Sequence, residues 1–284
     1  MLGARTGDLD DLNEDSLALA GVFCDHFGQG GVGGRFGPRQ LRYAQWPALG
    51  LALPAPKQWC DVGDLNVYPL NKQKNSEALE QQASALAKTG AHSLFLSGDY
   101  GNTPALFRGS MHRTDRGERG FVRIARKLDL MAAPRKYAPS GRSAATLEVM
   151  ESLAPGPSRV LFLLSSPHQR RAEVDVMRTL ALDMLIPYEV SATFLADLEQ
   201  AVQSLRAHCE AVYLSVDADA LCDPVTGTAW APLDAALNSL SKLPLRAGDL
   251  TGFIPAFGME GRVQASRVSD AFRSLAALIG GSSR

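Results

Sequence analysis

The stretch Ser215-Val216-Asp217-Ala218-Asp219-Ala220-Leu221 decides the fold, because it ends an apolar run at a pair of aspartates. Residues 211–216 are almost entirely apolar, which is typical of a strand buried on both faces of a parallel sheet. An Asp-x-Asp pair directly after such a strand places two carboxylates at the carboxyl edge of the sheet. Open α/β sheets bind their ligands at that edge.

Similar apolar runs alternate with helical patterns along most of the chain. We expect strands at residues 92–96, 121–124, 159–164, 185–190 and 211–216, and helices at residues 75–88, 143–153, 172–182, 196–208, 233–240 and 265–278. This alternation predicts a three-layer α-β-α sandwich with a mostly parallel sheet. Because the sequence contains no linker and no internal repeat, residues 1–284 are expected to form a single domain, with residues 1–16 loosely ordered.

The composition argues against several classes of function. A formal net charge of -1 gives no basic surplus for nucleic acid, and no apolar run reaches the roughly 18 residues of a membrane span. Residues 1–16 are polar and acidic, unlike a secretory signal. The 4 cysteines form no Cys-x-x-Cys pair and are expected to be reduced thiols. These features predict a cytoplasmic protein.

Aspartates also follow other expected strands, among them Asp25, Asp99 and Asp129. Because the carboxyl ends of parallel strands share one edge, these carboxylates are expected to converge on the rim that holds Asp217 and Asp219. Unpaired like charges at close range are costly. The rim therefore needs a metal ion, a lysine, an arginine or shared protons.

Four motifs, in order and with fitting separations, are similar to those of the ureohydrolase family of arginases, agmatinases and formimidoylglutamases. They are Gly30–Arg39 with Arg42 beyond it, Asp61–Asp64, Leu96–Tyr100 and Ser215–Leu221. The resemblance covers residues 21–278 and implies an arginase-like fold. It also implies two manganese ions, which activate a bridging water for attack on a guanidinium or formimino carbon.

The resemblance further implies six metal-binding side chains, and this sequence matches only part of that set. Asp217 and Asp219 match the final aspartate pair, and Asp129 matches the last aspartate of an Asp-x-His-x-Asp trio. The three remaining positions carry different residues, namely Tyr100 and Lys127 in place of histidines and Ala125 in place of the bridging aspartate. We therefore expect no metal, with Asp99, Asp129, Asp217 and Asp219 as residual ligand positions.

The positions that face the substrate in the family also differ. Gly252 stands where a glutamate contacts the amidine group, and Ser140 lies near the position of a proton-shuttling histidine. His26 and His168 each follow a strand end and are able to reach the pocket, although a loop or capping role explains them equally well. These four residues are our candidates for substrate binding.

We predict that the ammonium group of Lys127 replaces the metals by neutralising Asp129, Asp217 and Asp219. With Tyr100, these residues form the candidate catalytic set. Alternatively, Lys127 is a solvated surface residue, since lysines are seldom fully buried. The sequence is also compatible with a manganese site, or with a single magnesium or calcium ion held by carboxylate oxygens.

Three functions are compatible with these patterns. The first is a repurposed, metal-independent protein or enzyme that binds a small molecule in the old pocket. The second is a non-catalytic subunit or regulator of an oligomer, since relatives commonly form trimers or hexamers and a homo-oligomer is expected. The third is an active hydrolase of C–N bonds in a linear amidine, such as a guanidino or formimino compound, with an altered metal site.

Overall fold

The computed structural model describes residues 5–27, 33–44, 58–130, 141–154, 159–166, 168–169, 171–179, 183–185, 190–221, 230–255 and 259–281. These residues form an α/β fold built on one sheet of nine strands, in which all neighbouring strands are parallel. In sheet order the strands are β1 (Arg5–Thr6), β3 (Gln58–Asp64), β2 (Ser16–Val22), β4 (His92–Ser97), β9 (Leu245–Thr251), β8 (Ala211–Asp217), β5 (Arg119–Ala125), β6 (Val160–Leu164) and β7 (Asp183–Leu185).

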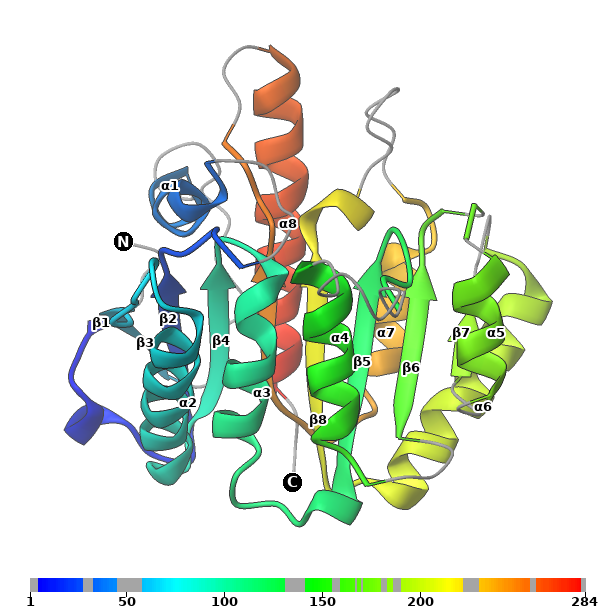
Figure 1. The fold of residues 1–284 in the computed structure, drawn as a ribbon, viewed down its shortest axis with the longest axis horizontal. Coiled ribbons are helices and arrows are strands. Elements are labelled where there is room, and N and C mark those ends of the chain that lie inside the picture. Colours follow the sequence, from blue (N-terminus) through cyan, green and yellow to red (C-terminus); the bar gives the residue numbers. More distant parts are fainter. Residues whose placement is uncertain are drawn as a thin grey trace.

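Helices cover both faces of this sheet, and the strand arrows in Figure 1 point to its upper edge. The α-helices are α1 (Gly37–Ala44), α2 (Lys72–Lys88), α3 (Thr103–Ser110), α4 (Gly141–Glu151), α5 (Arg171–Thr179), α6 (Ala192–His208), α7 (Leu233–Leu240) and α8 (Met259–Gly281). The helices α2, α3 and α4 lie in front of the sheet in Figure 1, and α7 and α8 lie behind it. This arrangement gives the predicted three layers.

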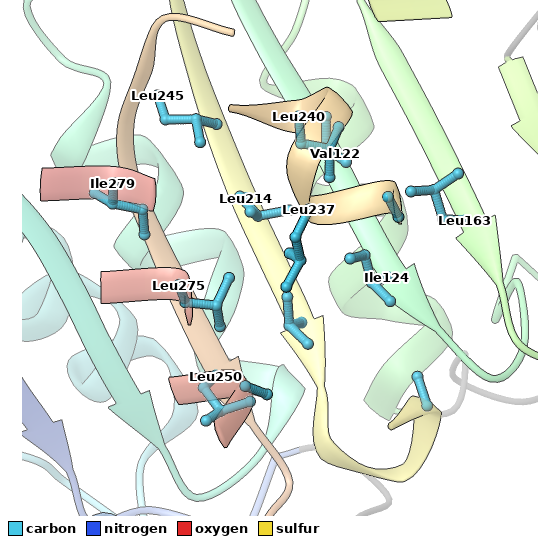
Figure 2. Close-up of a cluster of buried hydrophobic side chains, with 14 of the residues drawn as sticks. Val122, Ile124, Leu163, Leu214, Leu237, Leu240, Leu245, Leu250, Leu275 and Ile279 are labelled. Atoms are coloured by element: carbon cyan, nitrogen blue, oxygen red, sulfur yellow. The ribbon is translucent and has the colours of Figure 1, made fainter. Parts of the chain in front are cut away.

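Each face of the sheet has its own hydrophobic core. One core joins strand residues to α6, α7 and α8, and Figure 2 shows Leu237 and Leu240 of α7 and Leu275 and Ile279 of α8 packed over the strands. The other core joins the opposite strand faces to α2, α3 and α4. Because both faces are covered, β2, β4 and β8 are buried along their whole length. This explains their nearly continuous apolar sequences.

The local sequence accounts for the ends of the long helices. The side chain of Asn71 accepts a hydrogen bond from the backbone N–H of Lys74 and so caps the start of α2. The sequence pattern favours Asn75 or Ser76 as the cap, but the helix begins earlier. Gly90 follows its end with a φ of 90°, a left-handed conformation that favours glycine. Ser191 caps α6 in the same manner as Asn71 caps α2.

The structure differs from the expected pattern mainly in short elements. Residues 1–16 were expected to be loosely ordered, but Arg5–Thr6 pair with β3 as strand β1. The strand β3 and the helix α3 lie in segments that the hydrophobic pattern did not resolve. The strand expected at residues 185–190 is β7, and residues 186–189 lie outside the described part of the chain.

Candidate functional site

The carboxyl edge of the sheet holds a buried arginine that belongs to none of the four motifs. Arg123 lies in the middle of β5, and its side chain has no exposed surface. One of its terminal nitrogens, Nη2, lies 3.1 Å from Oδ2 of Asp129 and 3.4 Å from Oδ2 of Asp217. The other, Nη1, donates to the hydroxyl of Thr146 of α4 at 2.9 Å. The guanidinium group thus joins two residual ligand positions. We call Arg123, Asp129 and Asp217 the arginine clasp.

Tyr100 covers the flat face of this guanidinium. The carbon Cζ of Arg123 lies 3.6 Å from the centre of the Tyr100 ring, a cation–π arrangement. Burial raises the pKa of Tyr100, and the charge of Arg123 only partly offsets this effect. The phenol is therefore protonated in neutral solution and is not available as a base or as an anionic metal ligand. Its oxygen accepts a hydrogen bond of 3.5 Å from Thr146.

Lys127 does not lie where we predicted. Its side chain is exposed, and the cation between Asp129 and Asp217 is Arg123. The reason is local: β5 ends at Ala125, and the chain turns before it reaches Lys127. In the strand, Arg123 and Ala125 share one face because side chains alternate. The sequence left open a metal ion, a lysine, an arginine or shared protons at this rim, and the structure has Arg123 there.

The turn after β5 is held so that Asp129 faces Arg123. Asp129 has a φ of 51°, which is uncommon for a residue other than glycine. Gln169 accepts from the backbone N–H of Leu128 at 3.1 Å and donates to the carbonyl oxygen of Arg126 at 3.1 Å. Glu173 accepts from the backbone N–H of Leu130 at 3.2 Å. Such strained positions persist where surrounding contacts fix them, often at functional sites.

A third carboxylate, Asp249, lies two strands away from Arg123 at the same level of the sheet. It is fully buried in β9 and accepts hydrogen bonds from Thr103 at 2.6 Å and from Tyr213 at 3.0 Å. Burial raises the pKa of Asp249 to about 6, while the hydroxyls of Ser215, Thr103 and Tyr213 and the charge of Arg123 act in the opposite direction. Ionisation of Asp249 near neutral pH therefore depends on this set of donors.

Asp25 and Asp99 hold the loops at this edge of the sheet in place. Asp25 accepts from the backbone N–H groups of Gly33 at 2.9 Å and Arg35 at 3.2 Å. Asp99 accepts from Phe27 at 3.2 Å and from Gly101 at 2.6 Å. These carboxylates cap loops, and Asp99 directly precedes Tyr100. Asp99, predicted as a residual metal ligand position, thus has a structural role as a cap for these loops.

The other predicted site residues that the structure describes are His26, His168, Gly252 and Asp219. His26 has a side chain that is 38% exposed, with Nδ1 at 3.3 Å from Asp25, and His168 is also exposed. Gly252 adopts a φ of 72°, so a glutamate at this position would be strained. Asp219 is half-buried in the turn η5 (Ala218–Ala220). Ser140 lies outside the described residues.

Sequence reasoning missed Arg123, Thr146, Gln169 and Glu173. Only Arg123 gave a usable signal, because a charged residue inside the apolar strand Phe121–Ala125 must bury its charge and find a carboxylate. The other three residues are ordinary polar residues of helices or loops. Their contacts with the clasp and with the turn after β5 follow from the tertiary structure.

Comparison with known proteins agrees with the fold. The arginase family profile matches residues 15–269, and the chain therefore belongs to the arginase family. No curated protein matches the sequence. The resemblance to the ureohydrolases is thus confirmed at the level of the family.

Solved structures with the same fold include three enzymes at low sequence identity. Proclavaminate amidino hydrolase from Streptomyces clavuligerus has a TM-score of 0.75 and 17% identity, over 100% of this chain and 95% of that one. Arginase from Bacillus subtilis has a TM-score of 0.71 and 19% identity, over 92% and 98%. Formiminoglutamase from Trypanosoma cruzi, solved with Mn²⁺, has a TM-score of 0.74 and 16% identity, over 99% and 100%.

Two structural findings concern metals and membranes. Within the described ranges, no three His, Cys, Asp or Glu side chains are grouped so that they would hold a metal ion. Among the helices that the structure describes, none is both long and apolar enough to cross a membrane.

The arginine clasp leads to a stability prediction. Arg123→Met keeps much of the side-chain volume but leaves Asp129 and Asp217 without the guanidinium, so the free energy of unfolding should fall by about 3–5 kcal/mol. Lys127→Ala, at an exposed position, should change it by less than about 0.5 kcal/mol. Urea unfolding of both variants measures the difference, and an equal loss in the two would contradict the clasp.

Asp249 leads to a prediction about pH. Because its pKa is raised to about 6 in the folded protein, its protonation stabilises the fold at low pH, and this contribution is lost as pH rises from about 4 through 6. Tyr213→Phe removes a donor to the carboxylate and should cost about 1.5–3 kcal/mol at pH 7.5, where Asp249 is ionised. The cost should fall to about 0.5–1.5 kcal/mol at pH 5.

The matched control for this measurement is Tyr68→Phe, because Tyr68 is 38% exposed and its ring contact with Lys74 is kept by phenylalanine. Urea unfolding of both variants at the two pH values gives the comparison. A cost for Tyr213→Phe that is the same at both pH values would show that Asp249 does not titrate in this range.

Proposed function

We propose that this member of the arginase family does not carry out dimanganese-dependent hydrolysis and instead binds a small molecule at the carboxyl edge of its sheet. The observation that carries the proposal is the position of Arg123, whose Nη2 lies 3.1 Å from Asp129 and 3.4 Å from Asp217. The guanidinium group uses oxygen atoms that metal ions would need as ligands. Its charge also opposes a divalent cation at the same place.

The neighbouring positions support the same conclusion. Tyr100 stacks on Arg123 and is protonated at neutral pH, so it does not replace a histidine ligand. Ala125 has no donor atom, and Lys127 extends into solvent. Two manganese ions therefore do not fit the residues present. No step of hydrolysis is assigned to the site.

The rim of the site suggests the chemistry of the ligand. Asp25 holds His26 and Arg35 next to one another, with His26 Nδ1 at 3.3 Å and Arg35 Nε at 3.9 Å from its oxygens. The side chains of His26 and Arg35 are 38% and 40% exposed, while that of Asp25 is only 4% exposed. A buried carboxylate thus positions two basic groups toward solvent. Arg35 has the planar donor set that suits a carboxylate.

The loop that carries Tyr100 connects the rim to the clasp. A Cβ atom added to Gly98 would lie 3.0 Å from Cα of Arg35, so the two loops touch without room for a side chain. Gly98 is separated from Tyr100 only by Asp99, which also holds Phe27. We infer that the ligand is a small carboxylate recognised by Arg35 and His26 at this rim.

If the chain holds no manganese, a chelator should not change its thermal stability. Dialysis of the full chain against a chelator should leave the melting temperature unchanged, and elemental analysis should find no stoichiometric manganese. Incubation with manganese and either arginine or agmatine should release no urea. Two manganese ions per chain, or a large drop in melting temperature after chelation, would contradict the proposal that the chain works without a dimanganese centre.

The ligand part predicts saturable binding of small carboxylates. Glutamate and succinate should raise the melting temperature of the full chain at constant ionic strength, because a ligand that binds only the folded state stabilises it. Arg35→Gln should weaken the affinity for these carboxylates by about tenfold and so reduce the melting-temperature shift, because one charge-assisted contact of about 1.4 kcal/mol is lost. Arg178→Gln on α5, where the side chain is 77% exposed, is the matched control and should have no effect. Equal shifts in wild type and Arg35→Gln would place the ligand elsewhere.

A further inference from the structure

The turn that follows β4 contains a buried asparagine that the site described above does not use. Asn102 ends the 3-10 helix η3 (Tyr100–Asn102) and is 1% exposed. Its amide nitrogen Nδ2 donates to the carbonyl oxygen of Cys24 at 3.0 Å and to the hydroxyl oxygen of Ser97 at 3.0 Å, and the carbonyl oxygen of Asp99 lies 3.4 Å away. Because carbonyl oxygens only accept hydrogen bonds, these contacts decide which end of the amide faces Cys24.

The other end of this amide is held by a second buried asparagine. Asn75 of α2 donates from its Nδ2 to Oδ1 of Asn102 at 3.2 Å, and its own Oδ1 accepts from the backbone N–H of Tyr68 at 2.9 Å. Loss of one partner from such a buried pair leaves the other partner unsatisfied, which is costly. Asn102 therefore has one fixed orientation, and it connects α2 to the chain that follows β2.

The chain that follows β2 carries part of the rim of the proposed carboxylate site. The dipeptide Asp25–His26 lies between two anchored backbone groups. Before it, Asn102 donates to the carbonyl oxygen of Cys24. After it, the carboxylate of Asp99 accepts from the backbone N–H of Phe27 at 3.2 Å. The turn after β4 thus holds this dipeptide at both ends.

Close packing brings the same turn against both loops of the rim. A Cβ atom added to Gly98 would lie 2.5 Å from the carbonyl oxygen of Cys24 and 3.0 Å from Cα of Arg35. A Cβ atom added to Gly34 would overlap the carbonyl oxygen of Gly98. Because these positions have no room for a side chain, the turn after β4 directly supports the backbone on either side of the rim.

The next residue along the chain makes a buried hydrogen bond in another direction. Thr103 is fully buried, and its hydroxyl donates to Asp249 of β9 at 2.6 Å. The hydrogen bond from Asn102 to Cys24 instead ends on the backbone next to Asp25. Thr103 is therefore a matched control, because its loss also removes a buried hydrogen bond from this turn.

We propose that Asn102 is a positioning residue that holds His26 and Arg35 in the conformation that binds the carboxylate, an inference that rests on the proposed function of the rim. Affinity falls in proportion when only a fraction of the molecules has the binding conformation. A rim that is fixed beforehand also loses less conformational entropy when the ligand binds. The turn whose sequence resembles a metal-binding motif of the family thus orders ligand-binding residues in this chain.

The first test is calorimetric titration of the full chain with glutamate at constant ionic strength. Asn102→Leu keeps a branched side chain but removes both ends of the amide. About a tenth of the molecules should then retain the binding conformation, so the affinity should fall by about tenfold. Thr103→Val should change the affinity by less than about twofold, although both variants should lower the melting temperature. Equal losses of affinity in the two variants would overturn the proposal.

A double-mutant cycle separates positioning from a general loss of stability. His26→Gln should weaken glutamate binding by about tenfold in the wild-type background. In the Asn102→Leu background it should do so by less than about threefold, because a contact of a displaced side chain is already lost. Additive losses would show that Asn102 does not act through His26. If Asn102→Leu does not fold, Asn75→Ala replaces it with an expected loss of about threefold, and an unchanged affinity in Asn75→Ala would contradict the proposal.

Hydrogen exchange tests the anchor without a ligand. The backbone N–H of Phe27 should exchange about tenfold faster in Asn102→Leu than in wild type, and at an unchanged rate in Thr103→Val. An unchanged rate in Asn102→Leu would overturn the proposal whatever the ligand is. Faster exchange, combined with no binding of glutamate to the wild-type chain, would support the anchoring role of Asn102 and contradict the carboxylate ligand instead.

Discussion

The interaction on which the carboxyl edge depends is that of one guanidinium group with two aspartates. Arg123 is fully buried, and its charge lies 3.1 Å from Asp129 and 3.4 Å from Asp217. A buried ion pair is a modest source of stability, but the loss of one partner leaves an uncompensated charge in the interior. The three residues are therefore constrained to change together. Tyr100 and Thr146 also contact the guanidinium, so their packing is tied to the place of Arg123.

The parallel sheet explains why a cation is required there at all. Strands β4, β5, β8 and β9 end at the same edge, and each brings polar groups to it. In relatives that use manganese, metal charge balances such carboxylates, as the resemblance implies. In this chain a side chain does so, from the middle of β5 rather than from the loop beyond it. A covalently attached cation cannot dissociate, and a guanidinium keeps its charge throughout the neutral range.

The sequence allowed the class of fold and the need for a cation to be predicted, but not the residue that meets it. The apolar runs before Asp99 and Asp217 and the helical patterns between them correctly indicated a parallel α/β sheet. Alignment of short motifs placed Lys127 at a histidine position, and nothing in the motif shows that the chain turns after Ala125. Arg123 lies outside every motif, and its partner Asp129 is six residues away. Such pairings depend on the turn that Gln169 and Glu173 fix, and these contacts come from distant parts of the chain.

The substitutions at this edge are better explained as a compatible set than as independent losses. Ala125 lies on the same strand face as Arg123, and an aspartate there would add a further buried charge. Tyr100 presents its ring to the guanidinium at 3.6 Å, whereas a charged imidazole would repel it. Gly252, with a φ of 72°, has a backbone conformation that disfavours the glutamate that the family resemblance implies. Ala125 and Tyr100 lack the metal-ligating groups that the family resemblance implies, and Gly252 lacks the amidine contact. Of the three, Tyr100 also avoids a repulsion from Arg123. A buried arginine that is stacked on Tyr100 and paired with two aspartates therefore supports the interpretation of these residues as a compatible set.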